Sequence, residues 1–289
     1  MANLKEVRIR IASVNSTQQI TKAMKLVSAT KLRRAQNAIL QMRPYSQKLN
    51  GILSNLSDSI DDDSLKVYFD QREVKRVLLV VVTSDRGLCG SFNANVLKLA
   101  NRLVKEDFAG KEVTIMPIGK KAFEFFAKLS LPTNTDYKEI FHHLDAEHAF
   151  EIGTYILEQF RKGSFDKVEI VYNQFKNAAT QILTNEPFLP IVKQSGQGKV
   201  QEKNDYIFEP SKAEILEELI PRILKTQLYK ALLDSLASEH GARMVAMDKA
   251  TENAGELLKG LKLEYNRARQ AAITKEISEI VGGAAALSS

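Results

Sequence analysis

Apolar residues recur at alternating steps of three and four from the start of the chain, at Leu4, Val7, Ile11 and Val14. This spacing is typical of a helix that packs against a second helix along a heptad seam. The register continues as far as Leu56. In its middle it places polar side chains where apolar ones are expected, at Gln18, Thr21, Lys25 and Ser28. We predict a coiled-coil helix over residues 1–57, which Pro44 can kink without ending.

The other end of the chain repeats this pattern. No proline occurs in residues 222–289, which would form a rod of roughly 100 Å at 1.5 Å per residue. The seam is rich in alanine and has polar interruptions; it runs through Leu236, His240, Arg243, Met247, Ala250, Ala254, Leu257, Leu261 and Ala268. We predict a second coiled-coil helix over residues 211–287.

Between the two helices the periodicity changes. Residues 75–83 (KRVLLVVVT) contain an unbroken run of valine and leucine, which is typical of a strand buried on both faces. Further strands are predicted at 112–118, 166–172 and 180–190, and helices at 92–104, 120–128 and 146–161. This alternation predicts an α/β domain over residues 74–192, with helices packed on a mostly parallel sheet. Residues 193–208 are polar and contain glycine, and we predict a mobile loop there.

Positive charge is concentrated at one end. Residues 1–50 contain 10 Lys or Arg and one acid, Glu6, which gives this segment a charge of +9. Such a cluster attracts nucleic acid, an anionic lipid surface or an acidic protein. Residues 1–43 contain no Phe, Tyr or Trp to stack on bases, and the apolar face that a membrane-surface helix needs is interrupted. An acidic protein partner is favoured, and an adaptor that binds nucleic acid or anionic membrane is the alternative.

The composition bears on the cellular compartment in which the chain is expected. No apolar run reaches the ~18 residues of a membrane span. The single cysteine, Cys89, cannot form an internal disulfide, so a reducing compartment fits. Met1 leads directly into a charged, helix-like segment without the features of a secretory signal. We expect a cytoplasmic chain.

The motif at Ser84–Gly90 (SDRGLCG) follows the first buried strand, where α/β folds bind phosphate. It lacks the glycine spacing of a dinucleotide site and the GKS or GKT of a P-loop, so a turn or a protein-contact loop is favoured. No base neighbours Cys89 in sequence. His142, His143 and His148 do not share one helical face, and Asp61–Asp63 lack EF-hand spacing. We therefore predict no catalytic, cofactor-binding or metal-binding residue.

Four longer strings are more specific. They are ITKAMKLVSATKLRRAQ at 20–36, SDRGLCG at 84–90, ASEHGARMVAMDKATENAGEL at 237–257 and EYNRARQAAITKEISEIVGGAAAL at 264–287. Together they closely resemble the gamma subunit of F-type ATP synthase, of the bacterial type. The resemblance spans both ends and the middle of the chain. The sequence lacks the extra cysteine pair and the loop found in the light-regulated chloroplast type, so we do not expect switching by thiol oxidation.

The resemblance implies a fold and a function. The fold is a long antiparallel coiled coil of the N- and C-terminal helices with an inserted Rossmann-like α/β domain. The function is that of a central rotor shaft, which couples proton-driven rotation of the c-ring to conformational change in the alpha3beta3 catalytic ring and catalyses nothing itself. The implied partners are the alpha, beta and epsilon subunits and the c-ring. The implied location is the cytoplasmic face of the inner membrane, with membrane contact only through the Fo sector.

The resemblance also implies which residues touch the partners. Arg269 and Gln270 match an upper contact with beta-subunit loops. Arg243, with Met24 and Lys25, matches a lower contact near an acidic lever of beta. The loop beneath that lever is matched by Asp85, Arg86 and Cys89, and the region facing the c-ring and epsilon by Tyr206. Residues 282–287 (GGAAAL) match the part of the shaft that lies in an apolar bearing.

Overall fold

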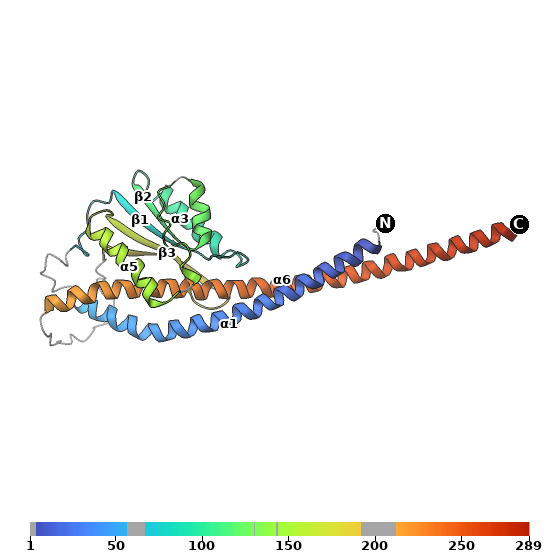
Figure 1. The fold of residues 1–289 in the computed structure, drawn as a ribbon, viewed down its shortest axis with the longest axis horizontal. Helices are drawn as coiled ribbons and strands as arrows, with labels where there is room; N and C mark the ends of the chain where they lie inside the picture. Colours follow the sequence, from blue (N-terminus) through green and yellow to red (C-terminus); the bar gives the residue numbers. More distant parts are fainter. Residues whose placement is uncertain (1–3, 57–66, 130, 143, 192–211, 289) are drawn as a thin grey trace. The chain divides into compact units, whose positions relative to one another are not determined.

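The structure, a computed structural model, describes residues 4–56, 67–129, 131–142, 144–191 and 212–288. Two long helices, α1 (Leu4–Leu56) and α6 (Lys212–Ser288), precede and follow the α/β elements in the chain (Figure 1). Pro44 and Pro221 lie inside these helices and do not end them. The predicted fold class is therefore confirmed. The predicted domain boundaries stay a prediction, and the expected loop at 193–208 and Asp61–Asp63 lie outside the described residues.

The sheet has four strands in the order β2-β1-β3-β4. Its members are β1 (Arg76–Val82), β2 (Glu112–Ile118), β3 (Lys167–Phe175) and β4 (Gln181–Leu189). The first strand pairs in parallel with β2 and β3, whereas β4 is antiparallel to β3. Six of the seven positions of β1 are buried, as its run of valine and leucine predicts for a central strand covered on both faces.

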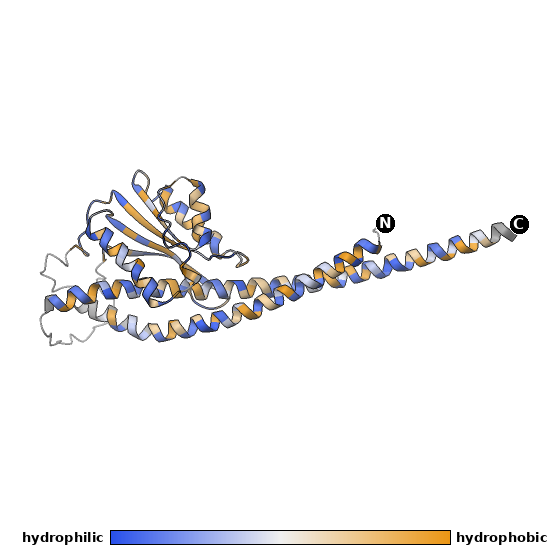
Figure 2. Cartoon of the chain, viewed as in Figure 1, coloured by the Kyte–Doolittle hydropathy of each residue, from blue (hydrophilic) through white to orange (hydrophobic). Residues whose placement is uncertain are grey.

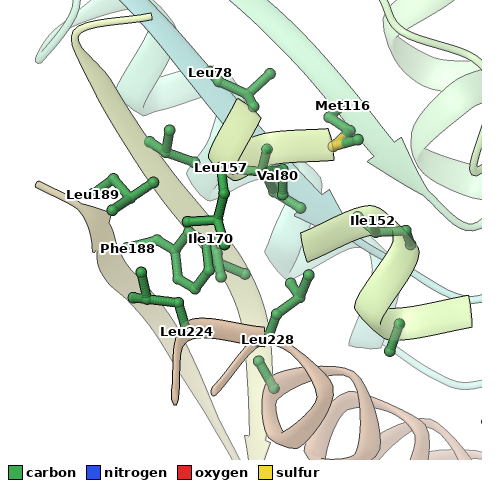
Figure 3. Close-up of a cluster of buried hydrophobic side chains, with 14 of the residues drawn as sticks. Leu78, Val80, Met116, Ile152, Leu157, Ile170, Phe188, Leu189, Leu224 and Leu228 are labelled. Carbon is green, nitrogen blue, oxygen red and sulfur yellow. The ribbon is translucent and has the colours of Figure 1, made fainter. Parts of the chain in front are cut away.

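Successive side chains of β1 point to opposite faces of the sheet and enter two separate cores. Leu78 and Val80 pack with α5 (Ala146–Arg161) and with the first part of α6. Figure 3 shows these side chains in one buried cluster with Ile152 from α5 and with Leu224 and Leu228 from α6. On the other face, the odd-numbered residues of β1 pack with α3 (Phe92–Lys105) and α4 (Lys120–Phe126). The α/β region thus has three layers, with α6 built into one of them.

Single residues at the start of α5 and of α4 determine where these two helices begin. The carboxylate of Asp145 accepts a hydrogen bond from the backbone N–H of His148 at 2.9 Å, which caps the N-terminus of α5. Gly119 precedes α4 with φ at 100°, and a Cβ there would lie 2.1 Å from the carbonyl oxygen of Thr83. Only glycine fits this turn, which holds the end of β2 against the end of β1.

The chain divides into two compact units, of which the first comprises residues 1–28 and 244–289. In this unit α1 and α6 run antiparallel, because Gln18 contacts Thr251 while Lys25, further along α1, contacts Asp248. The buried apolar residues are few: Val7, Met247, Ala254, Leu258 and Leu261. Figure 2 shows hydrophilic and hydrophobic residues alternating along both helices. The pair is a thin coiled coil with a narrow apolar seam.

The second unit comprises residues 29–243. It holds the α/β layers, the latter half of α1 and the first part of α6. Leu32, Ala35, Ile39 and Leu49 of α1 are buried, which confirms the seam spacing in this half of the helix.

Candidate partner-binding site

The loop between β1 and α3 is fixed on its α3 side by reciprocal hydrogen bonds between Ser84 and Asn93. The backbone N–H of Ser84 donates to Oδ1 of Asn93 at 3.0 Å, and Nδ2 of Asn93 donates to Oγ of Ser84 at 2.8 Å. The hydroxyl of Ser84 lies 2.7 Å from the carbonyl oxygen of Arg86. These contacts turn the chain sharply at the point where β1 ends.

The same loop is fixed to α4 on its other side. The carboxylate of Asp85 accepts a hydrogen bond from the backbone N–H of Lys120 at 3.1 Å, and the carbonyl of Ser84 accepts one from Lys121 at 3.2 Å. Because Asp85 lies at the N-terminus of α4, its negative charge also interacts favourably with the helix dipole. The loop is therefore held from two helices at once.

At its tip the loop presents two side chains to solvent. Arg86 is exposed, and Leu88 is 64% exposed with φ at 62°. A left-handed conformation is uncommon for a leucine, so surrounding contacts must maintain it. Cys89 is buried, and its Sγ accepts a hydrogen bond from Nδ2 of Asn93 at 3.3 Å. The cysteine faces inward, while its neighbours face outward.

Arg243 of α6 holds this tip from within the protein. Its side chain is largely buried, and its guanidinium donates to two backbone carbonyls of the loop: to Arg86 at 2.9 Å and to Gly87 at 3.2 and 3.3 Å. Nη1 also pairs with the carboxylate of Glu239, one turn earlier, at 2.5 Å. A buried cation needs such a set of acceptors to offset its loss of hydration.

The groups around Arg243 have shifted proton affinities. Burial raises the pKa of Glu239 above its ordinary value, and the attraction of Arg243 opposes this shift only in part. Burial lowers the pKa of His240 to about 4, and the positive charges of Arg243 and Lys31 lower it further. His240 is thus neutral at pH 7, and its Nδ1 has no hydrogen-bond partner within the described part of the chain.

Met24 and Lys25 belong to the coiled-coil unit. Nζ of Lys25 lies 2.6 Å from the carboxylate of Asp248, and both groups are partly exposed. Met24 is half-buried, and its carbonyl accepts a hydrogen bond from the hydroxyl of Ser28 at 2.8 Å. Lys25 therefore pairs with the other helix of its own coiled coil.

A family model described as ATP synthase matches residues 3–287. The ATP synthase gamma chain of Cytophaga hutchinsonii is 57% identical over 296 residues, which cover 99% of each chain. That of Flavobacterium johnsoniae is 55% identical over 288 residues, with the same coverage. The chain belongs to the ATP synthase gamma-chain family.

Solved structures share the gamma-chain fold. A chain from the OSCP/F1/c-ring part of the Euglena gracilis mitochondrial ATP synthase matches with a TM-score of 0.68 at 24% identity, covering 98% of this chain and 94% of that one. A chain from the rotor of the same enzyme matches with a TM-score of 0.64 at 23% identity, covering 93% and 98%. At these identities the likeness concerns the fold.

The structure brings four of the expected contact residues of this gamma chain together. Asp85, Arg86, Cys89 and Arg243 form one site in the second unit. Met24, Lys25, Arg269 and Gln270 belong to the first unit, where the last two are exposed on α6. Tyr206 lies outside the described residues. The role of each as a partner contact stays a prediction.

Two residues of the site were not found from the sequence. Glu239 precedes Arg243 by four positions, and this spacing is itself a signal for an ion pair on one helical face. Leu88 gave no signal, because its residue type does not reveal a left-handed backbone. Its exposure follows from the turn that Ser84, Asp85 and Arg243 impose.

No group of three or more His, Cys, Asp or Glu side chains among the described residues is placed to hold a metal ion. Among the helices that the structure describes, none is long and apolar enough to cross a membrane. His148, one of the histidines considered above, is exposed and pairs with Asp145 at 2.7 Å.

Proposed function

We propose that the chain is the rotor shaft of an F-type ATP synthase, which couples rotation of a proton-driven c-ring to conformational change in a ring of alpha and beta subunits. As a gamma chain it is a central-stalk subunit, and it has no catalytic site of its own. The observation that carries the proposal is the antiparallel pairing of α1 and α6 in a chain of this family.

The chemistry of that pair suits a shaft. Its seam includes polar contacts between Gln18, Thr21 and Thr251, so the two helices are in register without a thick apolar core. A thin rod of this kind can turn inside a ring. Its surface is mixed, because exposed apolar side chains such as Ile9, Ile20 and Leu263 stand among the charged and polar ones.

The exposed basic side chains of α1 support an acidic protein partner. Among the side chains that the structure describes, they are Lys5, Arg8, Arg10, Lys22, Lys31, Arg33, Arg34 and Lys48. Exposed ion pairs contribute about 0 to 1 kcal/mol each, so they can form and break during every turn. We infer that acidic segments of the beta subunits meet these side chains, and that Met24 and Lys25 of the first unit and Asp85 and Arg86 of the second each contact a beta subunit.

The C-terminal part of α6 differs in the side chains that it exposes. Beyond its pairing with α1 it exposes Ile273, Ile277, Ile280 and Val281, which lie on one side of the helix at steps of four, three and one. Exposed apolar side chains in a row mark a protein contact. We infer that this end is surrounded by an apolar bearing of the alpha and beta subunits, with Arg269 and Gln270 at its entrance.

The resemblance to the family supplies the remaining contact. By that resemblance, we assign the contact with the c-ring and the epsilon subunit to Tyr206. The chain then sits at the cytoplasmic face of the inner membrane and touches the membrane only through the Fo sector. The alternative of an adaptor for nucleic acid or lipid has no support among the relatives.

A rotation assay tests the proposal. The chain is assembled with the alpha and beta subunits of its own organism, the ring is immobilised, and a bead is attached through Asp107→Cys in a Cys89→Ser background. Asp107 is exposed in the turn after α3. ATP should drive rotation of the bead in one direction. If the chain does not assemble with alpha and beta, and instead binds duplex DNA with a steep dependence on salt, the adaptor is correct.

A further inference from the structure

The guanidinium of Arg243 is directed into its own chain. Three of its nitrogen atoms contact the carbonyls of Arg86 and Gly87 and the carboxylate of Glu239. Its side chain is 10% exposed, and that of Glu239 is 9% exposed. A guanidinium has five N–H donors in a fixed plane, so contacts on several sides fix its orientation and that of its acceptors. Little of this group is left for a partner protein to touch.

These contacts fix two successive peptide groups of the loop. The carbonyl of Arg86 lies 2.9 Å from Nη2 of Arg243 and 2.7 Å from the hydroxyl of Ser84. The carbonyl of Gly87 lies 3.2 and 3.3 Å from Nη2 and Nε of the same arginine. The next residue is Leu88, whose left-handed conformation needs external support. Arg243 supplies that support from beneath the turn.

The loop therefore presents a preset pair of side chains. Leu88 offers an exposed apolar group, and Arg86 beside it offers an exposed cation. A protein segment with a carboxylate next to an apolar side chain complements both. A loop that is already in its bound conformation loses less conformational entropy when it binds, so pre-organisation raises affinity.

We propose that Arg243, paired with Glu239, is a positioning residue that holds the loop at Arg86–Cys89 in shape, so that Leu88 and Arg86 dock onto an acidic and apolar segment of the surrounding ring. The partner's identity rests on the proposed function. The holding of the loop does not, because all of its contacts lie within this chain. Arg243 acts on the partner through the loop.

The native Cys89 reports on the loop directly. It is the only cysteine of the chain, it is buried, and its Sγ lies 3.9 Å from the carbonyl of Arg86. Its rate of reaction with Ellman's reagent is measured in the full-length chain. Arg243→Ala should raise the rate at least tenfold because the loop opens, and Glu239→Gln should raise it less. Arg222→Ala, an exposed cation on the same helix, should leave the rate unchanged.

A loss of global stability must be separated from a loosened loop. Leu228→Ala removes a buried side chain of the core that does not touch the loop, and it serves as the destabilised control. All rates are measured well below the unfolding transition of each variant. If Arg243→Ala reacts no faster than Arg222→Ala, or if Leu228→Ala reacts as fast as Arg243→Ala, the positioning role is overturned.

A double-mutant cycle then tests the route to the partner. ATP-driven rotation is measured for Arg243→Ala, Leu88→Ala and the double variant in the assembled complex. If Arg243 acts through the loop, the double variant is impaired no more than the worse single variant. Multiplying effects would mean a separate, direct contact and would overturn this step. A chain that fails to assemble at all overturns the proposed function and the partner, whereas the thiol rates still decide the holding of the loop.

Discussion

Thr21 of α1 and Thr251 of α6 face each other with their hydroxyl oxygens 2.8 Å apart. Each hydroxyl also reaches a carbonyl of its own helix, that of Gln18 at 3.0 Å and that of Met247 at 2.7 Å. These threonines occupy seam positions that an ordinary coiled coil fills with apolar residues. The polar pair defines the register of the two helices at the least apolar point of the seam.

This register predicts a specific disulfide. Thr21→Cys with Thr251→Cys, in a Cys89→Ser background, should oxidise readily, because side-chain atoms 2.8 Å apart are close to the geometry of a disulfide. Loss of free thiol, measured by maleimide labelling and mass spectrometry, reports the bond. Both cysteines lie in one rotor, so the bond should leave ATP hydrolysis by the assembled complex intact. Ser16→Cys with Thr251→Cys is the control, since Ser16 is exposed away from the seam. Equal oxidation of the two pairs would contradict the register.

The sequence predicts the helices and strands well because their periodicities are strong. The heptad spacing locates α1 and α6, and the unbroken run of valine and leucine at 77–82 identifies the central strand. The heptad spacing does not determine the register between α1 and α6, because each seam is compatible with several alignments of the two helices. It is set by individual contacts, such as that of Lys25 with Asp248.

The candidate site is less predictable. The position of the loop after β1 follows from the order of the elements, and the resemblance supplies Asp85, Arg86, Cys89 and Arg243. The direction of the Arg243 side chain does not follow from either, because it depends on where two backbone carbonyls lie in space. The exposure of Leu88 depends in turn on that arrangement.

The first part of α6 should contribute far more to stability than its later part. Leu228 is fully buried against the sheet, whereas Leu263 is 61% exposed. Leu228→Ala should lower the free energy of unfolding by about 2–5 kcal/mol, since it removes a buried side chain and leaves a cavity. Leu263→Ala should change it by less than about 0.5 kcal/mol. Urea unfolding followed by circular dichroism measures both, and similar effects would show that α6 is not anchored in the core as described.

Two glycines of α6 should respond oppositely to alanine. A Cβ at Gly260 would meet nothing within 4 Å, so Gly260→Ala should stabilise the chain by about 0.5–1 kcal/mol through helix propensity. A Cβ at Gly241 would lie 3.1 Å from the backbone of Ala178. Gly241→Ala should therefore destabilise by about 1 kcal/mol or more, because the helix must move away from its neighbour. Thermal unfolding compares the two variants; stabilisation by both would mean that α6 does not approach residue 178 this closely.

The buried His240 should make the protein sensitive to acid. Its folded-state pKa of about 4 lies below the ordinary value of 6.5, so the folded protein binds fewer protons than the unfolded chain between these values. The stability that His240 contributes is thus fully present above pH 6.5 and is lost as the pH falls towards 4. The loss amounts to about 3 kcal/mol. Glu239 acts in the opposite direction, because its raised pKa favours the folded state as the pH falls.

Comparison with His240→Gln isolates the histidine. Urea unfolding at pH 7 and pH 4.5 should show a larger loss of stability for the native chain than for this variant, while the contribution of Glu239 is common to both. His148→Gln is the matched control: His148 is exposed beside Asp145, and its pKa is raised. That variant should keep the native chain's loss of stability in acid. Equal pH dependence of the native chain and His240→Gln would show that His240 takes up its proton without cost in the folded state.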